Sequence, residues 1–171
     1  YDSSGNQIWI NRYNGPQNFY DMAKNVVIDM RKNVYVSGTS EGGRFDYCLI
    51  KYDSSGVLKW IKRYDYQGYD DLLTKSVLDN SGNIILTGYS NQITNFYFFC
   101  TVKIDSSGNQ LWAQRFNFGG FRDFKAWDIK TDIYDNIYVV GEGGEVSSGY
   151  YDYCTLKYNS AGNLIWKKYY N

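Results

Sequence analysis

The chain contains no histidine among its 171 residues, and proline occurs once, at Pro16. Without histidine, the chain can form no imidazole metal site, no Ser/His or Cys/His nucleophile pair and no imidazole acid–base catalyst. No apolar run approaches the roughly 20 residues that a membrane-spanning helix needs. We therefore expect no membrane insertion and no enzyme of the classes that depend on histidine.

The charges are balanced, because 18 lysines and arginines face 18 aspartates and glutamates. A nucleic-acid binder usually carries a strongly basic face, so we expect no nucleic-acid partner. The chain is instead rich in residues that favour strands and turns, with 19 tyrosines and 17 glycines. This composition is typical of many short strands joined by tight turns.

The sequence repeats itself with a period of about 52 residues. Three markers recur in one register, namely a turn with glycine four residues before tryptophan, an Asn-x-x-x-x-Gly run and a Cys-x-x-Lys run. They occupy residues 1–9, 52–60, 104–112 and 158–166; residues 33–38, 83–88 and 136–141; and residues 46–51, 98–103 and 152–157. Three independent markers in one register exclude coincidence.

One repeat, residues 21–65, contains four strand-like runs separated by turn residues. These runs lie at about 22–29, 34–39, 46–52 and 57–65. No stretch shows a sustained apolar period of 3.6 residues, which excludes helical solenoids. Four short antiparallel strands in about 50 residues are typical of a β-propeller blade. We therefore predict an all-β fold made of propeller blades, each a four-stranded antiparallel sheet.

The turn glycines and the tryptophans that follow them are the structural markers of the repeat. Glycine tolerates the left-handed backbone that closes a hairpin. A tryptophan at one equivalent place in every blade is expected to cover the gap between neighbouring twisted sheets. These markers are Gly56, Gly108 and Gly162, with Trp9, Trp60, Trp112 and Trp166.

We expect residues 1–171 to form one propeller segment. Its parts are an orphan outer strand with its loop at 1–20 and complete blades at 21–65, 71–117 and 123–171. Propellers close with about four to eight blades, so three would leave faces and edges exposed. The first expectation is a fragment whose further blades belong to the same protein, and the second is a ring of two copies. Closure in trans by the orphan strand is the third.

These residues resemble the SBBP-type β-propeller repeat. The likeness rests on the Asn-Val-Tyr-Val-x-Gly run at 33–38, the Cys-x-x-Lys-Tyr-Asp run at 48–53, and the glycine and tryptophan after it. The turn-to-tryptophan piece is also similar to the tryptophan-docking motif of PQQ-type propellers and, more loosely, to the sialidase Asp-box. The SBBP resemblance implies an extracellular or surface location in a prokaryote. It implies no reaction and no cofactor.

The cysteines and the turn aspartates are expected to have structural rather than functional roles. One cysteine per blade, far from any other, suits a small core residue, and no metal or disulfide is expected. These residues are Cys48, Cys100 and Cys154. The turn aspartates lack the density of a calcium loop, so turn capping is favoured for Asp2, Asp29, Asp53, Asp79, Asp105 and Asp132. The repeated lysines and arginines are expected on a solvated face or in pairs between blades.

The loops that vary between blades are the candidate binding surface. Two sets of connections vary between blades, and both should emerge at one end of the propeller. The connections between blades are residues 14–20, 66–70 and 117–122, and those between the second and third strands are residues 39–45, 89–96 and 142–151. Aromatic residues with arginine and glutamate on such loops suit glycan or protein recognition, although unselected loop filling remains open. The candidates are Phe19, Tyr20, Glu41, Arg44, Tyr66, Tyr69, Phe118, Phe121, Arg122, Glu142 and Glu145.

Three functions remain open at this point. The first is a non-enzymatic binding or scaffolding module that presents these loops to a glycan or protein. The second is a structural, self-assembling spacer without a ligand. The third is an enzyme of the quinoprotein or glycosidase type, for which we nominate Glu142 and Glu145 as the loop carboxylate pair.

Overall fold

The computed structural model describes residues 1–91, 96–119, 123–145 and 150–170, with only the backbone at position 145. These residues form strands and turns and contain no helix. It follows that this part of the chain has no helix that could cross a membrane. The all-β prediction is confirmed.

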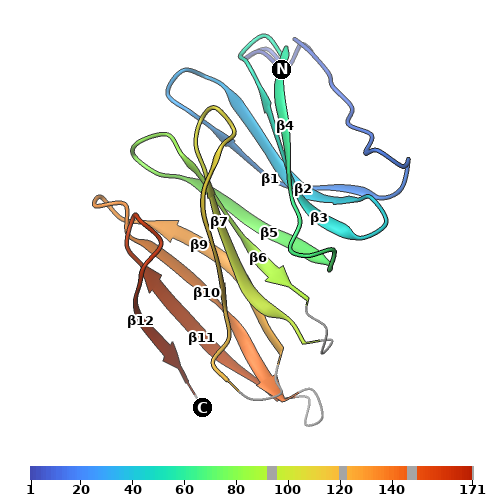
Figure 1. Ribbon diagram of the computed structural model, residues 1–171. Coiled ribbons are helices and arrows are strands. Elements are labelled where there is room, and N and C mark those ends of the chain that lie inside the picture. Colours follow the sequence, from blue (N-terminus) through green and yellow to red (C-terminus); the bar gives the residue numbers. More distant parts are fainter. Residues whose placement is uncertain (92–95, 120–122, 146–149, 171) are drawn as a thin grey trace.

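The strands form three separate sheets, each of four strands paired antiparallel in chain order (Figure 1). The strands of sheet 1 are β1 (Asp21–Ile28), β2 (Val34–Glu41), β3 (Phe45–Tyr52) and β4 (Leu58–Tyr64). Those of sheet 2 are β5 (Asp71–Leu78), β6 (Ile84–Ser90), β7 (Phe98–Ile104) and β8 (Gln110–Phe116). Those of sheet 3 are β9 (Asp123–Thr131), β10 (Ile137–Glu145), β11 (Tyr150–Tyr158) and β12 (Leu164–Tyr169). The four-stranded antiparallel unit expected from one repeat therefore occurs three times.

The hairpin turns are held by the side chain that begins them. The backbone N–H groups of Arg31 and Asn33 donate to Asp29 Oδ1 over 2.9 and 2.8 Å, and Asn33 Nδ2 donates to Asp29 Oδ2 over 2.8 Å. Asp105 makes the same set of bonds in the turn before β8. An aspartate at the first turn position thus satisfies backbone donors that the hairpin leaves free. This is the capping role expected for these aspartates.

The sheets stack face to face, and the apolar core lies between them. Strand β5 packs on β1, β2 and β3, and β9 packs on β5, β6 and β7. Tyr35, Tyr47 and Leu86 are among the buried residues between sheets 1 and 2. Phe99, Phe124 and Val139 are among those between sheets 2 and 3. The middle strands of sheet 2, β6 and β7, alternate their side chains between the two layers, so apolar residues occur at successive positions along them.

The cysteines are free thiols, and all three are buried. Cys100 lies in the core between sheets 1 and 2, and Cys154 lies in the core between sheets 2 and 3. Cys48 belongs to a smaller cluster with Ile50 and Tyr52 on the other face of sheet 1. Burial raises the pKa of Cys100 to about 12 and likewise that of Cys154 to about 12. Neutral thiols in apolar surroundings therefore act here as packing groups.

The described residues form no strand before Asp21, so the orphan outer strand expected within residues 1–20 stays a prediction. The backbone N–H of Glu41 in β2 donates to the carbonyl oxygen of Tyr20 over 2.8 Å, at the point where the segment enters sheet 1. Trp9 nevertheless packs against sheet 1, with its ring centroid 5.8 Å from that of Tyr52. Asn11 Nδ2 donates to the carbonyl oxygen of Gly56 over 2.7 Å. We call residues 1–13 the N-terminal arm.

Candidate functional site

The two connections after the second and fourth strands of sheet 1 emerge at the same end of that sheet, at the right in Figure 1. They join β2 to β3 and β4 to β5. In an antiparallel sheet every second strand ends at the same end of the sheet, so these two connections lie together. We call this region the loop end. The Asp-led turns lie at the opposite end.

The described part of the chain places the predicted loop residues in two groups. Phe19, Tyr20 and Arg44 are exposed, while Glu41, Tyr66, Tyr69, Phe118 and Glu142 are partly buried. Phe121, Arg122 and the side chain of Glu145 lie outside the described residues. The proposed carboxylate pair of Glu142 and Glu145 therefore has only one described side chain.

Phe118 is partly buried and packs among other aromatic rings. Its ring packs against Phe116, Phe124 and Tyr169, with centroid separations of 5.2, 5.3 and 5.7 Å. These rings join the core between sheets 2 and 3. Edge and tilted ring contacts give Phe118 a packing role, and its part in ligand binding stays a prediction.

Tyr66 is held from the next sheet by Arg115. The guanidinium carbon of Arg115 lies 3.7 Å from the ring centroid of Tyr66, which is cation–π geometry. Arg115 Nη2 also donates to the carbonyl oxygens of Ser90 and Asn91 over 3.2 and 2.7 Å. The β4–β5 loop is thereby fixed against sheet 2, which gives a variable loop a rigid support.

Arg63 occupies the equivalent position in sheet 1. Its Nη2 lies 2.6 Å from Asp46 Oδ2, and its Nη1 donates to Ser40 Oγ over 2.6 Å. The repeated arginines are expected on a solvated face or in pairs between blades, whereas Arg63 ties β2, β3 and β4 together within one sheet. Burial raises the pKa of Asp46, although the bonds from Arg63 oppose that rise.

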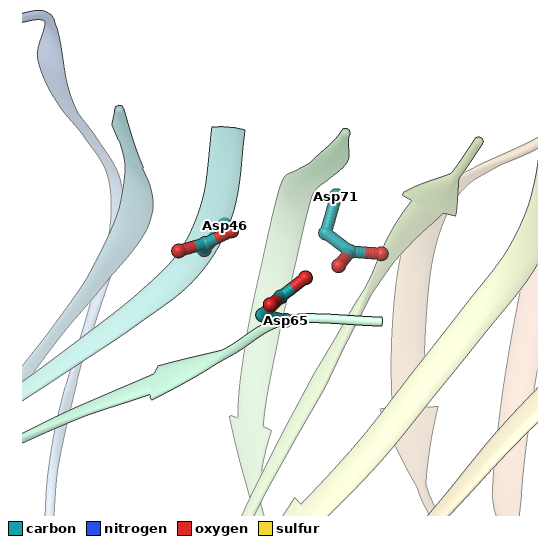
Figure 2. Close-up of side chains that lie close together, drawn as sticks. All are labelled: Asp46, Asp65 and Asp71. Atoms are coloured by element: carbon teal, nitrogen blue, oxygen red, sulfur yellow. The ribbon is translucent and has the colours of Figure 1, made fainter. Parts of the chain in front are cut away.

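Three carboxylates meet at the loop end between sheets 1 and 2. Asp46 lies on β3, Asp65 follows β4 and Asp71 begins β5, and Figure 2 shows the three side chains converging. One oxygen from each lies within 4.8 Å of the others. This cluster has the oxygen ligands of a divalent-cation site, but Arg63 already neutralises Asp46.

Asp71 is the buried member of the cluster. The backbone N–H of Tyr66 donates to Asp71 Oδ2 over 2.6 Å, while Oδ1 is buried without a hydrogen-bond partner. Burial raises the pKa of Asp71 to about 6, against the opposing effects of the nearby Ser90 hydroxyl, the Tyr66 N–H and the Arg115 charge. A carboxyl with that pKa keeps its proton well into the mildly acidic range.

Sequence reasoning missed this cluster, because its members come from three different elements. A signal was nevertheless present, since an aspartate begins the first strand of every repeat, as Asp21, Asp71 and Asp123. Each accepts a backbone N–H from an adjoining loop: Gly15 to Asp21 over 2.7 Å, Tyr66 to Asp71 over 2.6 Å, and Tyr97 to Asp123 over 2.9 Å. The repeated role of this position is loop anchoring.

A cleft opens beside the cluster, between the outer strands β4 and β8, with a volume of about 600 Å³. It combines two cations, a carboxylate, two amides and two tyrosine rings. Its lining residues are Arg63, Tyr64, Asp65, Tyr66, Gln67, Gln110, Ala113 and Arg115. A concave site with a few polar groups around aromatic rings has the character of a small-ligand pocket.

No family model matches the sequence, and no curated protein matches it significantly. The resemblance to SBBP-type repeats therefore stays a prediction from the motifs.

Proposed function

We propose that this chain is a non-enzymatic module of β-propeller blades that binds a glycan at its loop end. The observation that carries the proposal is the cleft between β4 and β8, with its rings, amides and charges. Tyrosine rings offer apolar faces to sugar rings, and carboxylates, amides and guanidinium groups match sugar hydroxyls as hydrogen-bond partners. The predicted candidates Tyr66 and Tyr69 belong to the loop that builds this cleft.

The proposal of propeller blades has its own support. Each repeat is an antiparallel four-stranded meander, and successive meanders stack through their faces. A tryptophan from one sheet also reaches the turn of the next, as Trp112 does when its Nε1 donates to the carbonyl oxygen of Ser160. Radial repetition of such sheets is how propellers limit exposed strand edges.

A binding role is favoured over catalysis by the state of the carboxylates. A glycosidase presents two positioned carboxyl groups on either side of the scissile bond. In the cluster, Asp46 is engaged by Arg63 and Asp71 is buried, so Asp65 alone is exposed. The proposed location, outside the cell or on the surface of a prokaryote, rests on the SBBP resemblance and on a ligand class that is abundant there.

The test is an oligosaccharide array probed with the purified chain, followed by calorimetry on the best hit. Asp65→Asn removes the lining charge with little change of shape, Gln110→Ala removes a lining amide, and each is expected to weaken binding about tenfold. Arg31→Ala, in a turn at the opposite end, is the matched control and should bind as the parent does. Binding that survives both cleft variants, or an array without any hit, would reject glycan recognition at this site, and a hit on a protein panel alone would favour a protein ligand.

A further inference from the structure

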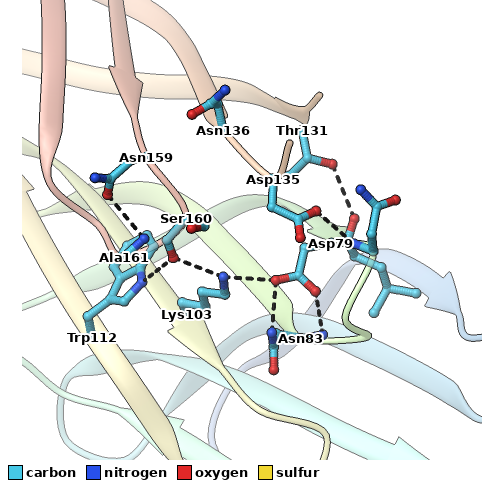
Figure 3. Close-up of polar contacts among 12 residues, drawn as sticks. Asp79, Asn83, Lys103, Trp112, Thr131, Asp135, Asn136, Asn159, Ser160 and Ala161 are labelled. Carbon is cyan, nitrogen blue, oxygen red and sulfur yellow. Dashed lines mark hydrogen bonds and ion pairs between the residues drawn. The ribbon is translucent and has the colours of Figure 1, made fainter. Parts of the chain in front are cut away.

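The two described sheet interfaces are made by the same set of contacts, which we call the docking device. Trp112 Nε1 and Lys103 Nζ both donate to the carbonyl oxygen of Ser160, over 3.2 and 3.0 Å (Figure 3). One sheet earlier, Trp60 Nε1 and Lys51 Nζ donate to the carbonyl oxygen of Ser106, over 3.4 and 2.7 Å. Each time, a tryptophan and a lysine of one sheet bind a turn of the next.

The indole ring packs directly against the glycine of that turn, and we call this contact position the glycine seat. A Cβ atom at Gly162 would lie 2.7 Å from Trp112 Cδ2, and one at Gly108 would lie 3.3 Å from Trp60 Cδ2. The N-terminal arm uses the same seat on sheet 1, since a Cβ at Gly56 would lie 2.6 Å from Trp9 Cδ2. Three turn glycines therefore each hold a tryptophan ring from the segment before them.

The last tryptophan of the series has no such seat within the described residues. Trp166 lies on β12, contacts Tyr138 of its own sheet at a centroid distance of 6.2 Å and remains 37% exposed. Lys157, the equivalent of Lys51 and Lys103, lies over the same tyrosine ring at 4.8 Å. The tryptophan and the lysine of the device are thus both in place at the end of the stack.

The face around Trp166 has the composition of a sheet interface. In sheet 1, Tyr35, Ser37 and Tyr47 point towards sheet 2 and are fully buried. Their equivalents in sheet 3 by the repeat are Tyr138, Val140 and Tyr153, and Val140 and Tyr153 are 43% and 78% exposed. Exposed apolar groups of this kind, gathered on one sheet face, mark an interaction surface.

The opposite end of the stack carries the complementary half of the device. On sheet 1 the arm covers Cys48, Ile50 and Tyr52, but Val26 and Ile28 are left 57% and 62% exposed. A cavity of about 230 Å³ remains between the arm and the sheet. The arm therefore covers only part of the face on which a preceding sheet would stack.

We propose that sheet 3 of one copy stacks on sheet 1 of a second copy, head to tail, with Trp166 taking the Gly56 seat in place of Trp9. Lys157 would then reach the carbonyl oxygen of Ser54, as Lys51 reaches that of Ser106. The N-terminal arm competes for the same seat and so limits assembly. Such a head-to-tail contact closes into a ring or continues into a filament.

A second copy is the occupant because the receptor turn is already known from within the chain. The turn at 53–56 has the same Asp-Ser-Ser-Gly sequence as the turn at 105–108, which accepts Trp60 and Lys51. The new contact therefore repeats an interface that the chain makes internally. It uses a surface distinct from the loop end and does not depend on ligand binding there.

The test is sedimentation equilibrium of the full chain and of tryptophan variants over a range of concentrations. Trp9→Ala should raise the association constant at least tenfold, and Trp166→Ala should lower it at least tenfold. The double variant should behave as Trp166→Ala does, because removal of the competitor cannot help once the docking ring is gone. Trp127→Ala removes another exposed tryptophan of sheet 3 and should leave association unchanged.

Val140→Glu and Val26→Glu separate a loss of association from a failure to fold. Both sites are exposed, so the folded chain should keep its circular dichroism spectrum while association falls with either change. The proposal is overturned if Trp166→Ala and Val140→Glu associate as the parent does, or if Trp9→Ala stays monomeric at about 100 μM.

Discussion

Lys103 Nζ lies 2.8 Å from Asp79 Oδ2, and both side chains are almost completely buried between sheets 2 and 3. The lysine also donates to the carbonyl oxygen of Ser160, so one ammonium group joins β7, the β5–β6 turn and the turn of sheet 3 (Figure 3). Burial alone would raise the pKa of Asp79, but the bonds from Lys103 and Asn83 hold it below its ordinary value.

Replacement of Lys103 should therefore lower the free energy of unfolding substantially. Lys103→Met leaves the Asp79 carboxylate buried without its counter-charge, and loss of one partner of a buried pair typically costs about 3–5 kcal/mol. Lys51→Met is the matched control, since Lys51 makes the same bond to Ser106 but Asp29 accepts the Tyr35 hydroxyl instead. Urea unfolding of both variants measures the difference, and equal small losses would show that the buried pair contributes little.

The turn glycines differ in their surroundings, so their replacement by alanine should lower the free energy of unfolding by different amounts. Gly162 and Gly82 have φ values of 84° and 77°, so alanine is strained at either position by about 1 kcal/mol. At Gly162 the new Cβ also meets Trp112, whereas at Gly82 no atom lies within 4 Å. Gly162→Ala should thus lower the free energy of unfolding by about 1–3 kcal/mol more than Gly82→Ala does. Equal losses in urea would mean that the indole shifts without cost.

The sequence was a good guide to whatever depends on the repeat. The strands, the capping aspartates and a packing role for Trp60 and Trp112 all follow from local patterns, because turn chemistry and alternation act within a few residues. The meeting of Asp46, Asp65 and Asp71 depends on how two sheets stack, which no local pattern encodes. The ring packing of Phe118 escapes prediction for the same reason, since its ring contacts come from β8, β9 and β12.

Asp71 should give the stability a pH dependence of unusual sign. Its pKa is raised from 3.8 to about 6, so the folded chain holds this proton to higher pH than the unfolded chain does. Between about pH 4 and pH 6 the unfolded state binds fewer protons at this site, and the free energy of unfolding falls as pH rises.

Asp71→Asn keeps an acceptor for the Tyr66 N–H but removes the titration. The variant should gain about 1–3 kcal/mol over the parent between pH 4 and pH 7, which is measured as the difference between their urea curves at each pH. The difference cancels the contributions of turn carboxylates such as Asp132, whose pKa is lowered to about 2, chiefly by its hydrogen bond from Asn136. A difference that does not change with pH would place the pKa of Asp71 near its ordinary value.

The three thiols should differ in reactivity according to what covers them. Cys100 and Cys154 lie between sheets, and only unfolding or separation of the sheets exposes them. Cys48 is covered by the N-terminal arm, whose Tyr13 packs against its cluster. Opening of a single segment costs less free energy than opening of a core, so Cys48 should react first with Ellman's reagent in the native protein. Trp9→Ala should accelerate that reaction at low protein concentration and leave the other two thiols protected until urea is added, whereas simultaneous reaction of all three would show that the arm is no independent cover.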